Sequence, residues 1–380
     1  MNNDKLIIQT PAPADIIDLG MGNPDFNLLP DEIFRLASEK AFKKGINASL
    51  QYGTEQGNGY FRATLADFLT HSFREQVDPA SLFISTGSSA GLNLLTALYT
   101  QAGDTVFVEE PTYFLALKIF ADHGLNIISI PIDDKGLNLD ILEEKLQQYS
   151  PKLLYTIPTF QNPSGKTLSL AQREKLVELA EKHDFLIIAD EVYHLLDLTG
   201  LKPPKPFALF AKDSAQIASL NSFSKILAPG LRLGWIEAHP KVLKKLTSTG
   251  LLDSGGGMNP FTSSIVHELV ESGDLEKNIA LLRRTYQSRL IIMDKALKEM
   301  LPIAEYILPR GGFFFWGRIP GQNTSKLRKR AKDFKVDFRQ GALFSANQGM
   351  TEYMRLCFAF YGEDEIIEGV RRLSRCIFKT

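Results

Sequence analysis

Short apolar runs recur along the first 240 residues and are separated by stretches with helical periodicity. The runs are continuous rather than alternating, which is typical of strands covered on both faces. Between two of them, residues 169–184 place their apolar side chains on one helical face. This alternation predicts an α/β fold, with a mostly parallel seven-stranded sheet between helical layers. The seven predicted strands are LFIST (82–86), TVFVEE (105–110), NIISIPI (126–132), LLYTIP (153–158), LIIADEV (186–192), QIASLNS (216–222) and RLGWIEA (232–238).

The pattern changes toward the C-terminus. The seventh run follows Gly230 too closely for a helical crossover, so it is predicted to be antiparallel to its neighbour. Long helical stretches (260–300) then precede four short strands and a final helix, which are AEYILP, GGFFFWGRI, VDFRQ, YMRLCFAF and EDEIIEGVRRLSRCI. We therefore predict a large domain of residues 46–270 and a smaller α+β domain built from residues 1–45 and 271–380.

Composition narrows the class of protein. The chain has 380 residues, 44% of them hydrophobic, which is enough for a large core. Its 43 basic and 44 acidic residues leave a net charge of −1, which argues against nucleic acid and anionic membranes as partners. Two cysteines make neither a disulfide framework nor a thiolate metal site, and the start MNNDKLIIQT does not resemble a signal peptide. We expect a cytoplasmic protein.

One uncharged segment, residues 79–103, has the length of a membrane span. It contains several serines and threonines, and Gly87 and Gly91 lie inside it. We interpret it as a buried strand, a glycine turn and a buried helix, and so expect no membrane-spanning segment.

Polar side chains follow the predicted strands where each strand ends. Ligands of such sheets bind beyond the carboxyl ends of the strands. The turn Gly87-Ser88-Ser89 opens a helix, whose free N–H groups suit a phosphate, although an ordinary helix cap explains the same residues. The other strand ends carry Tyr113, Asn162, Asp190, Tyr193, Ser222, Ser224, Lys225 and Arg232.

Asp190 and Lys225 are the most informative charges. A buried carboxylate is costly without a cation, so Asp190 forms either a structural salt bridge or a contact with a cationic ligand. Lys225 follows two serines, Ser222 and Ser224, in an otherwise uncharged run, and Arg232 comes seven residues later. An uncharged loop and a nearby like charge favour a neutral, nucleophilic amine. The whole set fits a phosphorylated, nitrogen-containing aromatic cofactor, whose aldehyde the lysine could bind as a Schiff base.

Three motifs that would indicate another ligand are incomplete in this sequence. Gly165-Lys166-Thr167 looks like the end of a phosphate-binding P-loop, but Phe160 stands where that motif requires glycine. Gly20-Met21-Gly22 lacks the third glycine of a dinucleotide fingerprint. The six histidines show no ligand spacing, so we expect no metal.

Several segments in sequence order resemble one family. They are IDLGMGNPDF, STGSSAGL, YTIPTFQNPSG, ADEVYHLL, SFSKILAPGLRLGW and YMRLCFAF. The chain resembles the fold-type I pyridoxal-phosphate enzymes of the class I/II aminotransferase group, from about Asp18 to the C-terminal helix. Within the group it is most similar to enzymes acting on 2-aminoadipate, aromatic or branched substrates. The resemblance implies the pyridoxal-phosphate-dependent transferase-like fold and a ping-pong transfer of the α-amino group of an L-amino acid to a 2-oxo acid.

The resemblance also implies roles around the cofactor ring. Lys225 would bind pyridoxal phosphate covalently and later carry a proton. Asp190 would pair with the pyridine nitrogen, and Tyr113 would stack on the ring, so these two act in catalysis with Lys225. Asn162 and Tyr193 would donate hydrogen bonds to the phenolic oxygen.

The resemblance implies that separate sets of residues bind the phosphate and the substrate. The residues that would hold the phosphate are Gly87, Ser88, Ser89, Ser222, Ser224 and Arg232. Tyr52 would reach the phosphate of a neighbouring subunit, which makes the expected assembly a homodimer with shared sites. Arg355 would bind the substrate α-carboxylate, with Asn162 and the backbone of Gly22 beside it.

Alternation in YMRLCFAF puts Arg355 on the face opposite Met354 and Leu356, beside small neighbours, so it is expected to reach into a cleft. A surface salt bridge with Glu352 is the alternative. The first 34 residues contain no arginine, which argues against recognition of a side-chain carboxylate. A glycine-rich run at residues 254–258 forms either a mobile lid or a flexible loop.

Fold does not fix the reaction. A pyridoxal-phosphate β-lyase, or other chemistry at the α-carbon, is the main alternative activity. A ligand-sensing regulatory module without catalysis is the other, and the near-neutral charge argues against it.

Overall fold

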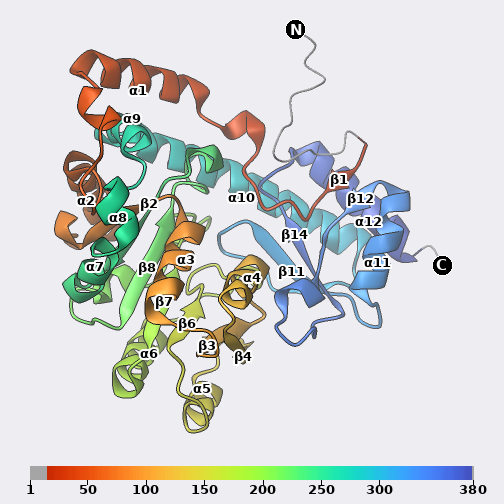
Figure 1. Cartoon of the computed structure of the whole chain (residues 1–380). Coiled ribbons are helices and arrows are strands. Elements are labelled where there is room, and N and C mark those ends of the chain that lie inside the picture. The colour runs from red at the N-terminus through yellow and green to blue at the C-terminus, as the bar shows by residue number, and fades with distance from the viewer. Residues whose placement is uncertain (1–14, 379–380) are drawn as a thin grey trace.

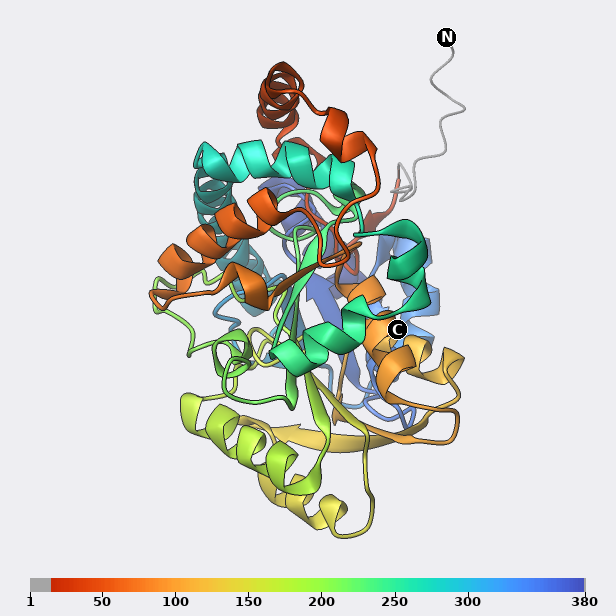
Figure 2. The same ribbon diagram turned by 60° about the vertical axis from the view of Figure 1, so that its left-hand side comes forward.

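The computed structural model describes residues 15–378. The N-terminal stretch interpreted above as not being a signal peptide lies outside these residues. Figures 1 and 2 show a large sheet covered by helices on both sides and a smaller sheet beside it. The long helix α10 (Asp274–Met300) extends from the large part of the molecule, around the large sheet, to the smaller part, around the smaller sheet (Figure 1).

The large sheet confirms the α/β prediction. Its strand order is β2-β9-β8-β7-β6-β3-β4-β5, and only β9 and β5 run against the others. The antiparallel direction expected of the seventh run is therefore confirmed in β9. The strands are β2 (Leu82–Ser85), β3 (Thr105–Glu110), β4 (Asn126–Asp133), β5 (Gly136–Leu137), β6 (Leu153–Thr156), β7 (Leu186–Asp190), β8 (Ile217–Ser222) and β9 (Gly234–Ala238).

The sheet has one strand more than predicted. The extra strand, β5, folds back on β4 as a short hairpin. Gly136 has a φ of 105°, which side chains other than glycine rarely adopt, and this allows the tight reversal. A two-residue strand carries too little apolar pattern to be read from the sequence.

Helices cover the large sheet and connect its strands. Helix α6 shows how the sequence sets their ends: Ser169 and Gln172 cap its first turn reciprocally, and it begins one residue after the predicted start. The helices of this part are α2 (Gly59–Phe73), α3 (Ser88–Tyr99), α4 (Phe114–Asp122), α5 (Leu139–Leu146), α6 (Leu170–His183), α7 (Pro240–Thr247), α8 (Gly250–Gly255) and α9 (Pro260–Glu271).

The smaller sheet has the order β10-β11-β14-β13 and is antiparallel. Beside it, β1 (Ile17–Asp18) pairs with β12 (Val336–Asp337), so an N-terminal strand joins the C-terminal part. The remaining elements are α1 (Asp31–Lys44), β10 (Glu305–Tyr306), β11 (Phe314–Arg318), α11 (Thr324–Ala331), β13 (Arg339–Gln340), β14 (Tyr353–Cys357) and α12 (Glu363–Phe378).

The prediction of one strand at VDFRQ was wrong. The segment divides at Phe338, so that β12 pairs with β1 while β13 pairs with β14. Phe338 is fully buried between the two pairings. A five-residue run could not show this, because both partner strands lie far away in the sequence.

Two further features are the character of the helices and the state of the cysteines. Among the helices within residues 15–378, none combines the length and apolar character needed to cross a membrane. Cys357 and Cys376 are both buried and unpaired.

The loop between β8 and β9 is held by close backbone packing. A Cβ at Gly234 would lie 2.4 Å from the carbonyl oxygen of Asn221 and 2.9 Å from Cα of Gly87. Only glycine permits this approach, which brings the end of β8, the start of β9 and the turn before α3 together. Arg232, with a φ of 45°, lies in this loop.

Candidate active site

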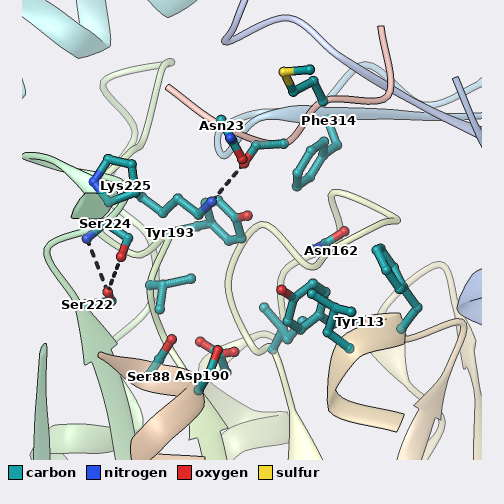
Figure 3. Close-up of a pocket in the computed structure, with 18 of the residues that line it drawn as sticks. Asn23, Ser88, Tyr113, Asn162, Asp190, Tyr193, Ser222, Ser224, Lys225 and Phe314 are labelled. Carbon is teal, nitrogen blue, oxygen red and sulfur yellow. Dashed lines mark hydrogen bonds between the residues drawn. The ribbon is translucent and has the colours of Figure 1, made fainter. Parts of the chain in front are cut away.

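A cavity of about 380 Å³ lies beyond the carboxyl ends of the central parallel strands. It is lined from the large part by residues of the β6, β7 and β8 ends, and from the smaller part by Phe314, Arg339 and Arg355. All the predicted site residues line it except Gly87 and Tyr52. Figure 3 shows Ser222 and Ser224 on one side and Tyr113 and Asn162 on the other.

Lys225 lies in the loop after β8 and is partly buried. Its Nζ donates a hydrogen bond to the carbonyl oxygen of Gly22, 2.8 Å away (Figure 3), and lies 5.4 Å from the ring centre of Phe313. Burial lowers the pKa of this amine to about 8. Arg232, which the sequence suggested as a cause, contributes in the same direction but least among the causes. The amine is thus partly neutral near neutral pH.

Asp190 ends β7 and is the acid of the cavity. Its Oδ2 accepts a hydrogen bond of 2.7 Å from the hydroxyl of Tyr155, while its buried Oδ1 has no hydrogen-bond partner. Burial raises the pKa of Asp190 to about 6, and the bond from Tyr155 opposes the rise. A buried acceptor without a donor is costly, so this oxygen is suited to a ligand N–H. The structural salt bridge considered for Asp190 does not form among residues 15–378.

An anion cradle lies at the start of α3. Gly87, with a φ of 100°, precedes the helix, and Ser88 and Ser89 begin it, so their N–H groups belong to the unsatisfied first turn. The hydroxyl of Ser222 lies 2.9 Å from that of Ser224. The guanidinium of Arg232 donates to the carbonyls of Thr86 and Pro229, and within residues 15–378 it has no acidic partner.

The packing of this cradle explains why Gly87 does not line the cavity. A Cβ at Gly87 would lie 3.0 Å from Nη2 of Arg232, so glycine lets the arginine lie against the turn. Gly87 therefore shapes the cradle through its backbone.

Arg355 enters from β14 and is buried. Its Nη1 donates to Oδ1 of Asn162 and its Nη2 to the carbonyl of Gly20, both at 2.9 Å, while Nε has no partner. The guanidinium lies 3.9 Å from the ring centre of Phe314. The alternative contact with Glu352 is wrong, because Glu352 pairs with Arg318 at 2.6 Å.

Two tyrosines complete the predicted set within the cavity. Tyr113 precedes α4, and burial raises the pKa of its hydroxyl to about 12. Tyr193 is buried with its ring edge-on to Phe313 and Phe314, and burial raises its pKa well above the usual value. Both phenols therefore stay protonated and can donate hydrogen bonds at neutral pH.

Tyr52 lies outside the cavity. Its side chain is 78% exposed and borders a separate hollow formed with Gly257, Met258 and Tyr60. The glycine-rich run is ordered here: Gly255 ends α8, and Gly256 and Gly257 pair with Gly53. In this structure Gly257 and Met258 of the run border the Tyr52 hollow, and no residue of the run lines the cavity.

Sequence reasoning missed three residues of the site. Tyr155 is hidden in a continuous apolar strand, and its only signal is a phenol one position before the strand's end. Arg339 pairs with an acid 321 residues away, which leaves no local signal. Phe314 belongs to the run GGFFFWGRI, where the face of each aromatic residue could not be assigned.

These groups can be tested against the predicted cofactor. The cavity offers a buried amine with a lowered pKa, a carboxylate oxygen without a donor, and a serine–arginine cradle at a helix N-terminus. An aldehyde, a protonated pyridine nitrogen and a phosphate are their chemical complements. The residues fit pyridoxal phosphate, and the fold and site together define a fold-type I enzyme of this cofactor.

Comparison with known proteins agrees with this assignment to the pyridoxal-phosphate enzymes. The family model of aminotransferase class I and II matches residues 14–373. The chain is 35% identical to aromatic-amino-acid aminotransferase 1 of Thermococcus litoralis, over 96% of this chain and 88% of the relative.

Solved structures give the same result. The kynurenine aminotransferase of Pyrococcus horikoshii, in complex with PMP, has a TM-score of 0.90 at 35% identity, covering 97% of this chain and 92% of that one. The α-aminoadipate aminotransferase of Thermus thermophilus, complexed with N-(5'-phosphopyridoxyl)-L-leucine, has a TM-score of 0.87 at 31% identity, covering 96% and 92%.

The chain belongs to the aminotransferase class I and II family. It is an aminotransferase, and its cofactor is pyridoxal phosphate. The predictions of fold, family, activity and cofactor are confirmed.

Proposed function

We propose that Lys225, Asp190, Arg232 and Arg355 carry the reaction in the roles expected from the sequence. One observation supports this most. Lys225, Arg232 and Arg355 line one cavity, and none of them has an acidic partner within residues 15–378, where Asp190 is the one acid lining that cavity. Two anionic groups of the ligands, a phosphate and a carboxylate, would neutralise this excess of positive charge.

When bound, pyridoxal phosphate supplies an aldehyde that combines with amines and a ring that accepts electrons from the substrate. Lys225 would hold the aldehyde, Asp190 the ring nitrogen, and Asn162 and Tyr193 the phenolic oxygen. The cradle of Ser88, Ser89, Ser222, Ser224 and Arg232 would hold the phosphate. With the substrate amine in place of Lys225, the free Nζ of Lys225 would carry the proton from the substrate Cα to the carbon that held the cofactor's aldehyde.

Arg355 would bind the substrate α-carboxylate. Its guanidinium is fixed by Asn162 and Gly20, and its Nε is left without a partner. Phe314 lies against the guanidinium face, and Phe344 lies 4.9 Å away from it. A planar cation between aromatic rings is well oriented for a carboxylate.

The substrate class follows from the other walls. Large apolar side chains are among those that line the cavity, namely Met21, Tyr113, Phe114, Leu115 and Phe314. The named relatives are aminotransferases of aromatic amino acids, kynurenine and α-aminoadipate. We propose an L-amino acid with one carboxylate and an aromatic or large apolar side chain.

The proposal includes a homodimer. Tyr52 and Tyr60 are 78% and 81% exposed and border one hollow, an arrangement that suits burial against a second copy. Tyr52 would then reach the phosphate bound by the neighbouring subunit.

We also propose two domains, one of residues 46–270 and one of residues 1–45 with 271–380. We propose a cytoplasmic location as well, which the two unpaired cysteines support.

Two experiments test this function. A panel of L-amino acids is added to the purified holoenzyme without oxo acid, and the cofactor absorbance is followed; phenylalanine, tyrosine or leucine should convert it, with release of the matching 2-oxo acid. Release of pyruvate and a thiol from cystathionine would instead support lyase chemistry. For the dimer, Lys225→Ala subunits mixed with Tyr52→Phe subunits should regain activity, and an active monomer in sedimentation would end the idea.

A further inference from the structure

A second arginine lies beside the expected carboxylate anchor. Arg339 on β13 is directly opposite Arg355 on β14 in the antiparallel register, so both side chains project from the same face. Arg339 lines the cavity together with Gly20 and Met21. A Cβ at Gly20 would lie 2.8 Å from Nη1 of Arg339, so the guanidinium is packed against this loop.

The two arginines differ in their partners. Asp18 binds Arg339 through two parallel hydrogen bonds, Nη1 to Oδ1 at 3.0 Å and Nη2 to Oδ2 at 2.9 Å. Arg355, by contrast, has no acidic partner within residues 15–378. The cavity wall therefore presents one guanidinium that is available to an anion and one that is already neutralised.

Asp18 is itself held firmly. Its side chain is 11% exposed, its Oδ1 also accepts from the N–H of Gly20, and its own N–H donates to the hydroxyl of Tyr361. The other nearby acid, Asp337, lies 3.6 Å from Arg339 but makes a two-bond pair with Arg328. Asp18 is thus the acid that occupies the fork of Arg339.

This arrangement limits what the substrate can carry. A second substrate carboxylate could occupy this Nη1–Nη2 fork of Arg339 only by displacing Asp18, which would leave a largely buried carboxylate without its cation. Separating such a pair is strongly unfavourable. Because Asp18 occupies the fork, substrates with two carboxylates are disfavoured. The enzyme discriminates against them through a competing carboxylate of its own, and not through an added attraction to other substrates.

We propose that Asp18 determines specificity in this enzyme by keeping Arg339 from binding the side-chain carboxylate of dicarboxylic amino acids. The inference rests on the proposed function, because it takes Arg355 as the α-carboxylate anchor. Removing the charge of Asp18 converts Arg339 into a second carboxylate site. The substrates gained are those of the 2-aminoadipate and glutamate class.

The test compares Asp18→Asn with the unaltered holoenzyme. Asparagine keeps an oxygen that can accept from Gly20, and it replaces the charge and the second acceptor oxygen with a neutral NH2 group. For phenylalanine and 2-aminoadipate, kcat/KM is measured in the half-reaction, and 3-phenylpropionate and glutarate are used as competing ligands that do not react. The ratio of the two kcat/KM values should shift toward 2-aminoadipate by about tenfold or more, and glutarate should bind correspondingly more tightly.

Two further variants make the result specific. Asp18→Asn combined with Arg339→Gln should lose the gain, because the freed guanidinium is its cause. Asp337→Asn removes the other acidic charge near Arg339 without vacating its fork, so it should shift the ratio far less. Circular dichroism and the thermal midpoint identify any variant that does not fold; for these, glutarate binding to Asp18→Ser replaces the comparison.

The inference is overturned if Asp18→Asn leaves both ratios unchanged, if the gain persists without Arg339, or if Asp337→Asn gives the same gain. It is also overturned if Arg339→Gln alone abolishes turnover of 2-aminoadipate, since Arg339 would then already bind that carboxylate. Failure of the proposed function is distinct, because the unaltered enzyme would then convert neither amino acid.

Discussion

The hydroxyl of Tyr155 lies 2.7 Å from Oδ2 of Asp190 and leaves Oδ1 of the same carboxylate without a partner. The two residues come from neighbouring parallel strands, β6 and β7, and both are buried. The tyrosine therefore supports the charged form of Asp190 on one side, while the other oxygen is available to the ring nitrogen. Among the contacts that oppose the burial-induced rise in the pKa of Asp190, this hydrogen bond is the largest.

Tyr155→Phe should weaken catalysis without preventing cofactor binding. Loss of the hydrogen bond raises the pKa of Asp190 further, so less of the carboxylate is charged at neutral pH. A hydrogen bond to a charged group contributes about 1.5–3 kcal/mol, so kcat should fall by roughly tenfold to a hundredfold. The acidic limb of the pH–rate profile should also move to higher pH. Tyr149→Phe, which removes a hydroxyl at a ring contact with Phe107, is the matched control.

An unchanged acidic limb in Tyr155→Phe would show that the phenol does not act through Asp190. Loss of cofactor absorbance would instead indicate a structural role. The two outcomes are separated by measuring the visible spectrum and kcat on the same preparation.

The reactivity of Lys225 toward the cofactor should depend on pH near 8. Burial lowers the pKa of its amine to about 8, so the neutral form is a minority below this pH and dominates above it. In cofactor-free protein, the rate of covalent attachment of pyridoxal phosphate, trapped with borohydride, should rise by about tenfold from pH 7 to pH 9 and then level off. An ordinary lysine amine would keep gaining reactivity beyond pH 10. Lys225→Ala should trap no cofactor at this position.

The sequence predicts which strand-end residues line the cavity, because these residues lie at or soon after the ends of strands. Asp190 and Ser222 are the last residues of their strands and Lys225 follows Ser222 by three positions, and parallel strands bring such positions to one edge. The same reasoning placed Arg355 in a cleft, because alternation within one strand assigns its face. Local pattern was sufficient wherever one element alone decides where a side chain points.

The remainder depends on contacts between distant segments. The pairing of Asp18 with Arg339 joins residues 321 positions apart, and the division of residues 336–340 between two sheets depends on β1 and β14. Tyr155 looks like an ordinary member of an apolar strand until Asp190 is seen beside it. No periodicity encodes such relationships, since they are fixed by tertiary packing.

Glu237 should make the stability of the fold depend on pH. It is buried in β9 with Oε2 unpartnered, and burial raises its pKa to about 8, aided by the charge of Glu191. The folded protein keeps this proton up to about pH 8, whereas the unfolded chain releases it near its ordinary value. The free energy of unfolding contributed by this residue therefore falls as pH rises through this window, by at most about 1.4 kcal/mol per pH unit.

Glu237→Gln removes this proton from the balance. Relative to the unaltered protein, the variant should gain stability steadily from pH 5 to pH 8, measured by urea unfolding at each pH. Replacing the exposed Glu181 by Gln should leave the pH dependence as it is. A constant difference between Glu237→Gln and the unaltered protein across this range would show that the buried carboxyl does not hold its proton.

Arg355→Lys should separate substrate binding from cofactor binding. The guanidinium offers a fork already oriented by Asn162 and Gly20, and a lysine amine cannot copy two parallel bonds to a carboxylate. Because charge-assisted bonds contribute about 1.5–3 kcal/mol each, the half-saturating concentration of phenylalanine should rise by about tenfold to a hundredfold or more. Cofactor absorbance should not change, since the hydrogen bonds and ring contacts of Arg355 do not involve the anion cradle.

The decisive comparison for Arg355 uses phenylalanine and 2-phenylethylamine, which differ only by the carboxylate. The unaltered enzyme should discriminate strongly between them in the half-reaction, and Arg355→Lys should discriminate far less. Arg318→Lys is the control, because Arg318 lies on the neighbouring strand and pairs with Glu352 instead of lining the cavity. If Arg355→Lys discriminates as strongly as the unaltered enzyme, another residue binds the carboxylate; Arg339, its neighbour across the sheet, is then the first to examine, and Asp18 would have to release it.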